Sequence, residues 1–367
     1  MEQFYVQGSH RTIGARIGEV YRCQVRGVLD AMKVGLIPSL FGEEPYALVA
    51  ERFDRDTGAV ANFKAHAGTL LQELEGISAS ADVALNDLVI LNCMDELCSY
   101  SVQRGPGETC TCIGVKPEHG SVLLAQNLDA STCFDGFQLL LQIAPDDAPE
   151  QLLFTIPGLL GFTGVNRHGV AVVPNALTML DCCPSGTPVT LVVRGILCSA
   201  SADEAASFVR RIQHGAAQNY TIADPRALYG FECSADSKQE FTPRSAAHFC
   251  YLAHTNHPLL HMRWAADDGR AQPYSSTESS RLRLVEAEKV LSGADSEFTR
   301  EKIVGLLTSH VNEPNCICRH GLTGGNMTLG SVIYELSEKP VLYIAPGPGC
   351  SNTYRPFTFC ARRTPGF

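Results

Sequence analysis

The sequence lacks an excess of positive charge and has no long apolar run. Its 29 Lys and Arg residues are outnumbered by 39 Asp and Glu residues, which gives a formal net charge of -10. Because binding to nucleic acid rests largely on basic side chains that neutralise phosphates, this balance argues against a nucleic-acid partner. No uninterrupted apolar run reaches about 18 residues, the length of an ordinary membrane-spanning helix. We therefore expect a soluble protein with neither a nucleic acid nor a membrane as partner.

Common catalytic and metal-binding motifs are also missing. Neither Gly-x-Ser-x-Gly nor Gly-x-Gly-x-x-Gly occurs, which argues against an α/β-hydrolase elbow and a dinucleotide-binding loop. The close cysteine pairs lack the C-x₂-C spacing of zinc sites. A metal site formed by His254, His257 and His261 stays open as an alternative, although Pro258 disfavours a helix that holds all three on one face. Our expectation is no metal and no cofactor.

The cysteines are numerous, at 15, but they are scattered along the chain. The first residues, Met-Glu-Gln-Phe-Tyr-Val, lack the basic region and apolar core of a signal peptide. We therefore expect reduced thiols in a cytoplasmic protein rather than a disulfide framework.

The pattern of apolar residues changes near residue 100. Before it, apolar residues recur at steps of three and four, as in Thr12–Met32 and Phe63–Ile77, which predicts mostly helices. From Cys110 onward, short apolar runs separated by turn residues predict strands with helices between them. Hydrophobic residues make up 45% of the 367 residues, which is enough for the core of a single α+β domain with helices outside its sheets. The expected strands are 139–143, 152–156, 169–173, 220–223, 228–232, 249–252, 331–334 and 341–344, and the expected helices are 189–198, 202–214, 275–292 and 299–311.

The stretch from Cys110 to Asp129 is the centre of the predicted site. It reads as two short strands, 110–115 and 121–127, joined by the turn-forming run Lys-Pro-Glu-His-Gly. If that turn is symmetric about the bond between residues 118 and 119, Cys110 lies opposite Asn127 on the same face. Asp129 then becomes a diagonal neighbour within side-chain reach. A thiol, an amide and a carboxylate would thus meet at one strand end.

Cys110 has two interpretations. It can pack as a small hydrophobic residue, as most buried cysteines do. Alternatively, a cut in the Gly- and Pro-rich loop 104–109, which is predicted to be exposed, makes it a first residue. Its own α-amine, with an ordinary pKa of about 7.7–8.0, could then take the thiol proton near neutral pH. One cut would create both nucleophile and base.

Two asparagines at strand ends are candidate oxyanion donors. Asn256 lies in His-Thr-Asn-His after the strand 249–252, and Asn175 follows the strand 169–173. A side-chain amide at such a place can donate to an oxyanion. It can equally satisfy loop backbone, and both interpretations stay open for each residue.

Six motifs occur in the same order as in one known family. In these motifs the sequence resembles the acyl-coenzyme A:6-aminopenicillanic acid acyltransferase family. That family is a branch of the N-terminal nucleophile hydrolases and is also similar to choloylglycine hydrolases and penicillin V acylases. The matching pieces are Gly8–Gly14, Asn86–Asn92, Cys110–Cys112, Gln126–Asp129, Gly164–Leu177 and His254–His257.

The resemblance implies a four-layer αββα precursor that cuts itself between Thr109 and Cys110. Residues 1–109 would be a mostly helical segment, released by the cut but retained in the fold, and residues 110–367 the catalytic segment of the same domain. Cys110 matches the nucleophile, Asp129 the carboxylate that orients its amine, and Asn256 an oxyanion-hole donor. Asn175 aligns with another position that lines the site and binds substrate.

The implied activity is that of a cysteine amidohydrolase or acyltransferase acting on linear amides or acyl thioesters. A small acyl or aminoacyl group would pass through a thioester on Cys110 to water or to an amine. The expected partners are a small-molecule amide or acyl-coenzyme A substrate and the chain's own N-terminal fragment, and a homo-oligomer stays open.

Departures from the family pattern keep a non-catalytic alternative open. Thr109 replaces the glycine usual before the nucleophile, and its β-branched side chain could slow a strained self-attack. The family's Ser-Arg pair falls on Gly324 and Gly325, so its arginine has no direct match, and Arg319 is the nearest candidate. The alternative is an uncleaved descendant that serves as a binding protein.

Overall fold

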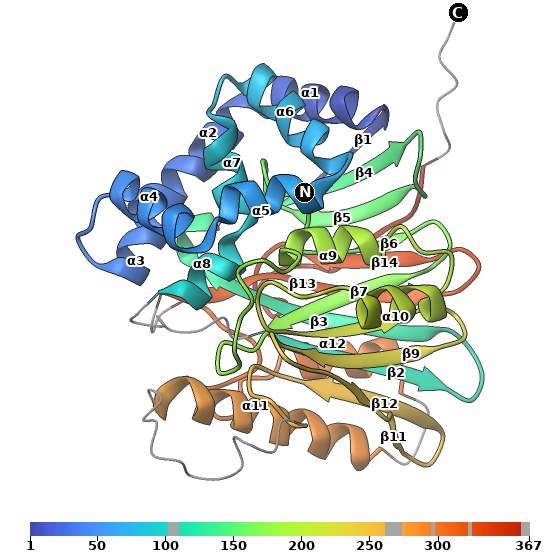
Figure 1. The fold of residues 1–367 in the computed structure, drawn as a ribbon. Coiled ribbons are helices and arrows are strands. Elements are labelled where there is room, and N and C mark those ends of the chain that lie inside the picture. Colours follow the sequence, from blue (N-terminus) through green and yellow to red (C-terminus); the bar gives the residue numbers. More distant parts are fainter. Residues whose placement is uncertain (102–109, 261–273, 295–297, 322–324, 361–367) are drawn as a thin grey trace, which may run out of the picture.

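Two β-sheets packed face to face, with helices outside each sheet, form the body of the protein (Figure 1). The computed structural model describes residues 1–101, 110–260, 274–294, 298–321 and 325–360. The predicted α+β class and its αββα layering are therefore confirmed. Among the described helices, none combines the length and apolarity needed to cross a lipid bilayer.

In the part of the chain that the structure describes, the first sheet has eight strands and includes the start of the chain. Its first strand pairs in parallel with the fourth strand of the chain, and the other neighbours are antiparallel. The order is β1 (Gln3–Gly8), β4 (Leu139–Pro145), β5 (Gln151–Thr155), β6 (Thr163–Asn166), β7 (Ala171–Ala176), β8 (Gln218–Ala223), β9 (Leu228–Cys233) and β10 (Lys238–Phe241).

Among the described residues, the second sheet has seven strands, and all of its neighbouring strands are antiparallel. Its central strands lie against β7 and β8 of the first sheet, so both faces of each sheet's middle are buried. This explains why these strands are nearly continuous apolar runs. The order is β11 (Arg244–Ser245), β12 (Phe249–His254), β2 (Thr111–Pro117), β3 (Val122–Ser131), β13 (Asn326–Leu336), β14 (Val341–Ala345) and β15 (Arg355–Phe357).

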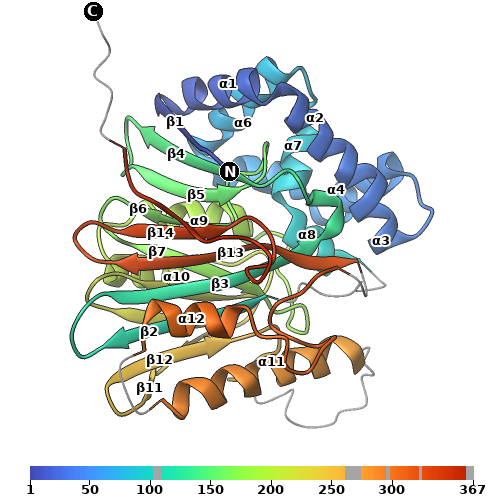
Figure 2. The ribbon, with the colours of Figure 1, turned by 180° about the vertical axis from the view of Figure 1, so that it is seen from behind.

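Each sheet is covered on its outer face by a pair of helices. The helices α9 (Val189–Ile196) and α10 (Ala202–Arg211) pack on β7, β8 and β9 of the eight-stranded sheet. The helices α11 (Tyr274–Ser292) and α12 (Arg300–Leu307) pack on β12, β3 and β13 of the seven-stranded sheet (Figure 2).

The first hundred residues are mostly helical, as predicted, and gather at one end of the sheets (Figure 1). The expected helix over 12–32 is divided at Tyr21, and the expected helix over 63–77 is divided at Gly68, whose φ of +53° few side chains tolerate. A short π-helical turn, Met32–Leu36, joins the second and third helices. The helices are α1 (His10–Val20), α2 (Arg22–Ala31), α3 (Ile37–Phe41), α4 (Tyr46–Thr57), α5 (Ala59–Ala67), α6 (Leu70–Ala81), α7 (Leu85–Asn92) and α8 (Met94–Tyr100).

A buried ion pair joins this helical segment to the rest of the chain. Arg194 on α9 donates from Nη1 and Nη2 to the two carboxylate oxygens of Glu73 on α6, at 2.9 and 3.1 Å. His10 also bonds this carboxylate, at 3.0 Å. Burial alone would raise the pKa of Glu73, but Arg194 and His10 outweigh it and lower the pKa. The pair therefore stays ionised inside the protein and links residues on either side of the segment 102–109.

Candidate active site

The hairpin of β2 and β3 is shifted by one residue from its predicted register. Thr111, not Cys110, pairs with Asn127, because the turn is centred on His119 rather than between residues 118 and 119. A shift of one residue moves side chains to the opposite face of a strand. The Asn127 amide accordingly donates to the backbone carbonyl of Leu307, at the end of α12, and to that of Ile317, on the connection after α12, at 2.8 and 2.9 Å. The prediction that Cys110 lies opposite Asn127, with Asp129 on the same face, is wrong.

Cys110 belongs to the face that looks toward the other sheet. Its sulfur lies 3.7 Å from the backbone carbonyl oxygen of Asp129, and only 2% of the residue is exposed. Cys112 has the same orientation, with its sulfur 3.8 and 3.7 Å from the carbonyl oxygens of Val173 and Pro174. Cys110 therefore points into the space between the sheets rather than toward the outer helices.

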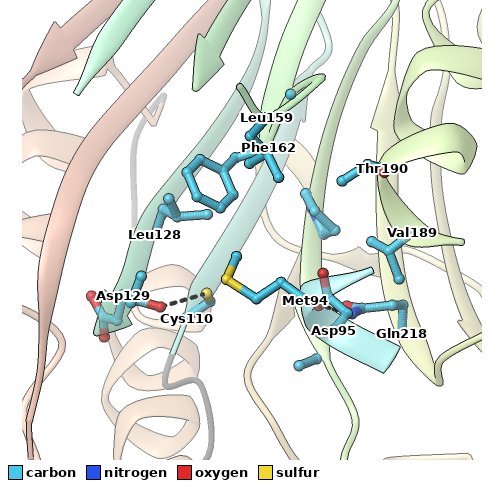
Figure 3. A pocket seen from close by; sticks show the side chains of 14 residues that line it. Met94, Asp95, Cys110, Leu128, Asp129, Leu159, Phe162, Val189, Thr190 and Gln218 are labelled. Carbon is cyan, nitrogen blue, oxygen red and sulfur yellow. Dashed lines mark hydrogen bonds between the residues drawn. The ribbon is translucent and has the colours of Figure 1, made fainter. Parts of the chain in front are cut away.

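A narrow pocket opens beside Cys110 (Figure 3). Its volume is about 460 Å³, counting the part open to solvent. Figure 3 shows Cys110 and Asp129 on one side and Asp95 and Gln218 on the other, with Met94 extending between them. Most of the walls are apolar. The lining residues are Met94, Asp95, Cys110, Leu128, Asp129, Ala130, Leu159, Gly161, Phe162, Pro174, Ala176, Val189, Thr190 and Gln218.

The carbonyl oxygen of Cys110 is where the other candidate residues meet. Asn175 donates to it from Nδ2 at 3.3 Å, and Arg283 donates from Nη1 at 2.6 Å. The other guanidinium nitrogen, Nη2, donates to Oδ1 of Asn256 at 3.0 Å, and the Asn256 amide donates to the carbonyl of Ala176 at 3.1 Å. Asn175 thus contacts Cys110 directly, and Asn256, also far away in the sequence, is connected to Cys110 through Arg283.

Arg283 is a site residue that the sequence analysis missed. It lies on α11 and is 1% exposed. Burial lowers the pKa of Arg283 to about 10, while the nearby Asp129 and Cys110 act to raise it. The guanidinium therefore remains positive at neutral pH, next to the candidate nucleophile. The available signal was its position on the apolar stripe of a helix, in line with Ala287 and Leu291, where a charged residue is rarely buried without a partner.

Asp129 is held on the outer face of β3. Its Oδ1 accepts a hydrogen bond from Oγ1 of Thr328, which lies opposite it on β13, at 2.7 Å. The backbone N–H of Arg319 donates to the same Thr328 oxygen at 3.0 Å, and Nη1 of Arg319 donates to Oγ of Ser279 at 3.0 Å. Ser279 is also within 3.5 Å of Arg283 Nε. Arg319 thus supports Asp129 indirectly, through Thr328, whereas Arg283 contacts the Cys110 carbonyl directly.

The histidines of the alternative metal site have protein partners. His254 uses both ring nitrogens, with Nδ1 at 2.6 Å from the carbonyl of Thr255 and Nε2 at 3.0 Å from Glu232. His257 bonds Oγ of Ser280 through Nδ1 at 2.7 Å, and burial lowers its pKa to about 4. His261 lies outside the described residues. His254 therefore has no ring nitrogen left for a metal ion in this arrangement.

Two partly buried acidic residues of α8, Asp95 and Glu96, follow Met94, and Asp95 lines the pocket. Asp95 accepts from Nε2 of Gln218 at 2.5 Å, and Oε1 of Glu96 accepts from the Val189 backbone N–H at 3.0 Å. Burial raises the pKa of both groups, and the charge of Asp95 raises that of Glu96 further. Both groups are therefore expected to keep their proton to a higher pH than an exposed carboxyl group does.

The comparisons with known proteins agree on one family. The sequence model of the family described as acyl-coenzyme A:6-aminopenicillanic acid acyl-transferase matches residues 115–349. The chain is also similar to the acyl-coenzyme A:6-aminopenicillanic-acid-acyltransferase 40 kDa form of Emericella nidulans. That relative is 29% identical over 270 residues, which are 72% of this chain and 71% of the relative. The protein therefore belongs to the acyl-coenzyme A:6-aminopenicillanic acid acyltransferase family, and the resemblance found in the sequence is confirmed.

Solved structures with similar chains have low sequence identity. A mutant of conjugated bile acid hydrolase from Clostridium perfringens is 11% identical, with a TM-score of 0.44, over 68% of this chain and 97% of that one. Penicillin V acylase from Agrobacterium tumefaciens is 14% identical, with a TM-score of 0.43, over 68% of this chain and 85% of that one.

Proposed function

We propose that the protein is a self-cleaving cysteine amidohydrolase or acyltransferase. The observation that carries the proposal is the network at the Cys110 carbonyl, directly after the segment 102–109. Asn175 and Arg283 donate to this carbonyl, and Arg283 also donates to Asn256. Two amides and a buried cation near a candidate nucleophilic cysteine form an environment suited to a reactive thiol and to an oxyanion. Family membership supports acyl transfer or amide hydrolysis as the reaction class.

The proposed activation is a cut between Thr109 and Cys110. The Cys110 sulfur attacks the carbonyl carbon of Thr109, and the peptide C–N bond breaks as the nitrogen takes a proton. This leaves a thioester between the two residues and a free α-amine on Cys110. Water then hydrolyses the thioester, which releases the Thr109 carboxylate and restores the thiol. Thr109 lies outside the described residues, so this step is supported by the position of Cys110 alone.

In the proposed catalytic cycle the new α-amine acts as base. With an ordinary pKa of about 7.7–8.0, it takes the thiol proton as the sulfur attacks the substrate's acyl carbon. Asp129, held by Thr328, orients the protonated amine, and Asn256 donates to the oxyanion. The amine then gives its proton to the departing amine or thiol. The acyl group remains on sulfur as a thioester until water or an acceptor amine takes it.

Retention of the helical segment after the cut is part of the proposal. Besides the pair of Arg194 and Glu73, the parallel pairing of β1 with β4 places the start of the chain inside the first sheet. The buried side chain of Asn92 adds hydrogen bonds to Gly158 and Leu160, at 2.8 and 2.9 Å. These contacts cross from residues 1–101 to residues beyond the cut, so the two fragments are expected to stay together.

The pocket favours a small acyl or aminoacyl group. Leu128, Leu159, Phe162 and Val189 provide apolar walls. The space is narrowed by Met94, which lies on the last helix before the proposed cut. An amide or an acyl-coenzyme A, the donor named for the Emericella relative, would present its acyl carbon to Cys110 from this pocket.

Mass spectrometry of the purified chain tests the proposal. The wild-type protein should yield fragments 1–109 and 110–367, and Cys110→Ala should remain one chain. Cys112→Ala is the matched control, since this cysteine is also buried and faces the same way two residues along the strand. It should still be cut. A wild-type chain that stays whole and inactive would favour the uncleaved binding protein instead.

Hydrolysis and transfer are separated by one further assay. A fragmented protein is incubated with an acyl thioester, with and without a small amine. Free acid in both reactions identifies a hydrolase, and an amide formed only with the amine identifies a transferase. Cys110→Ala should form neither product.

A further inference from the structure

Four metal-ligating side chains that do not line the pocket converge on one another. They are His310, Cys318 and His320, on the connection between α12 and β13, and Cys350, on the connection between β14 and β15. One candidate ligand atom from each lies within 4.8 Å of all the others. A search of the described residues for three or more histidines, cysteines or carboxylates with ligand atoms this close together finds this group.

Three of the six separations between the candidate ligand atoms are close to the edges of a metal tetrahedron. The two histidine Nε2 atoms are 2.9 Å apart, the two cysteine sulfurs 3.5 Å apart, and the Cys350 sulfur is 3.2 Å from Nε2 of His320. Zinc bonds of about 2.3 Å to sulfur and about 2.0–2.1 Å to nitrogen give edges of roughly 3.3–3.8 Å in a tetrahedron. These three separations differ from the edges of such a tetrahedron by less than about 0.5 Å. The other three separations between the four ligand atoms are within 4.8 Å.

We propose that His310, Cys318, His320 and Cys350 bind one Zn²⁺ ion as a closed structural site. Two thiolates and two imidazoles are a donor set that zinc prefers, and four protein ligands leave no position open for catalysis. Cys318 is fully buried whereas the other three ligands are exposed, so the ion could enter from solvent and bind to a sulfur that is held inside the protein. The two thiols each give up a proton on binding.

The proposed ion would fix a connection that also serves the active site. Arg319 lies between two of the ligands, and its N–H bonds the Thr328 hydroxyl that donates to Asp129. The backbone N–H of Thr328 in turn donates to the carbonyl of Arg319 at 3.1 Å. Zinc would therefore fix the position of Arg319, which supports Asp129 through Thr328, and would tie this segment to the connection that contains Cys350.

The first test measures zinc in protein made without a histidine tag. The protein is produced with zinc and reductant and then dialysed, and metal is quantified together with free thiols. One zinc per chain is expected in wild type and equally in Cys110→Ala, so the result does not depend on self-cleavage. His310→Ala and Cys350→Ser should weaken zinc retention by more than the roughly 10- to 100-fold typical of losing an outer-shell partner. His119→Ala and Cys23→Ser, which change exposed residues elsewhere, should retain the ion.

Cobalt provides an independent readout. Replacing zinc by Co²⁺ should give the ligand-field bands of a tetrahedral ion and sulfur-to-cobalt charge transfer, and the charge-transfer band should weaken in Cys350→Ser. Wild-type protein with free thiols but only trace zinc overturns the proposal. So does a disulfide between Cys318 and Cys350 that forms even with zinc and reductant present, or zinc retained by the double variant of His310 and Cys350.

Discussion

Replacing Arg194 with Met should loosen the helical segment from the rest of the protein. The guanidinium is 1% exposed and makes two hydrogen bonds to Glu73, so the variant leaves a buried carboxylate with His10 as its remaining ionisable partner. Removing one member of a buried pair costs about 3–5 kcal/mol, because the other charge stays buried without compensation. We expect the free energy of unfolding to fall by this amount at pH 7.

Arg210→Met is the matched control. Arg210 pairs with Glu240 at 2.6 Å, but the two side chains are 46% and 39% exposed. Exposed pairs are worth about 0–1 kcal/mol, since water screens them. The difference between the two variants should therefore be at least about 2 kcal/mol.

Urea unfolding measures this difference in the uncut Cys110→Ala background, where both segments remain one chain. In self-cleaved protein, size-exclusion chromatography at increasing urea should show fragment 1–109 leaving the Arg194→Met complex at lower urea than the wild-type complex. Equal free energies of unfolding for Arg194→Met and Arg210→Met would refute the reasoning. Unfolding at low pH gives a further check. Because the folded-state pKa of Glu73 is lowered, its contribution to the free energy of unfolding is fully present above the ordinary carboxyl pKa of about 4.3, and it is lost as the pH falls through the folded-state pKa.

Three other substitutions test separate parts of the site. Arg283→Lys should lower kcat of the cleaved enzyme by roughly 10- to 100-fold, because a lysine cannot make the two-pronged guanidinium contacts, which are worth about 1.5–3 kcal/mol. Arg281→Lys, at an exposed position of the same helix, should leave kcat unchanged. Steady-state kinetics measure both, and equal effects would show that Arg283 is not part of the site. Glu96 has a raised pKa, so its contribution to the stability of the fold is greatest below about pH 4.3 and declines as pH rises. Thermal melts of the uncut chain should show this decline, and Glu96→Gln, which keeps an acceptor for the Val189 N–H, should make it smaller. A wild-type melting temperature that does not change with pH would contradict the prediction. Thr109→Gly should speed self-cleavage by removing a β-branched side chain, as a gel time course would show, and slower cutting would mean that the threonine helps the reaction.

The sequence allowed the layers and most of the candidate site to be predicted, but not the local register. Cys110, Asn175 and Asn256 were selected from strand ends and family motifs; Asn175 bonds the Cys110 carbonyl, and Asn256 is connected to it through Arg283. The error at the β2–β3 turn arose because the five turn residues are compatible with two positions of the turn centre. The flanking strands are buried on both faces, so they lack the alternation of polar and apolar residues that would decide between the two registers.

The two unpredicted features have different causes. Arg283 lies on an ordinary-looking helix, and only folding reveals that its face is turned toward Cys110. The proposed zinc ligands come from two connections, and the 29 residues between His320 and Cys350 contain a whole hairpin. Such spacing matches no short motif, so a search by sequence pattern passes over it.

The pairing of β1 with β4 also constrains how the protein is produced. The strand Gln3–Gly8 is synthesised long before its neighbour Leu139–Pro145, so the rim of the first sheet closes only after much of the later segment has emerged. A recombinant chain that starts at residue 110 would leave β4 with an unpaired row of backbone donors and acceptors, a ready template for aggregation. Co-expression with residues 1–109 should be the route to soluble material.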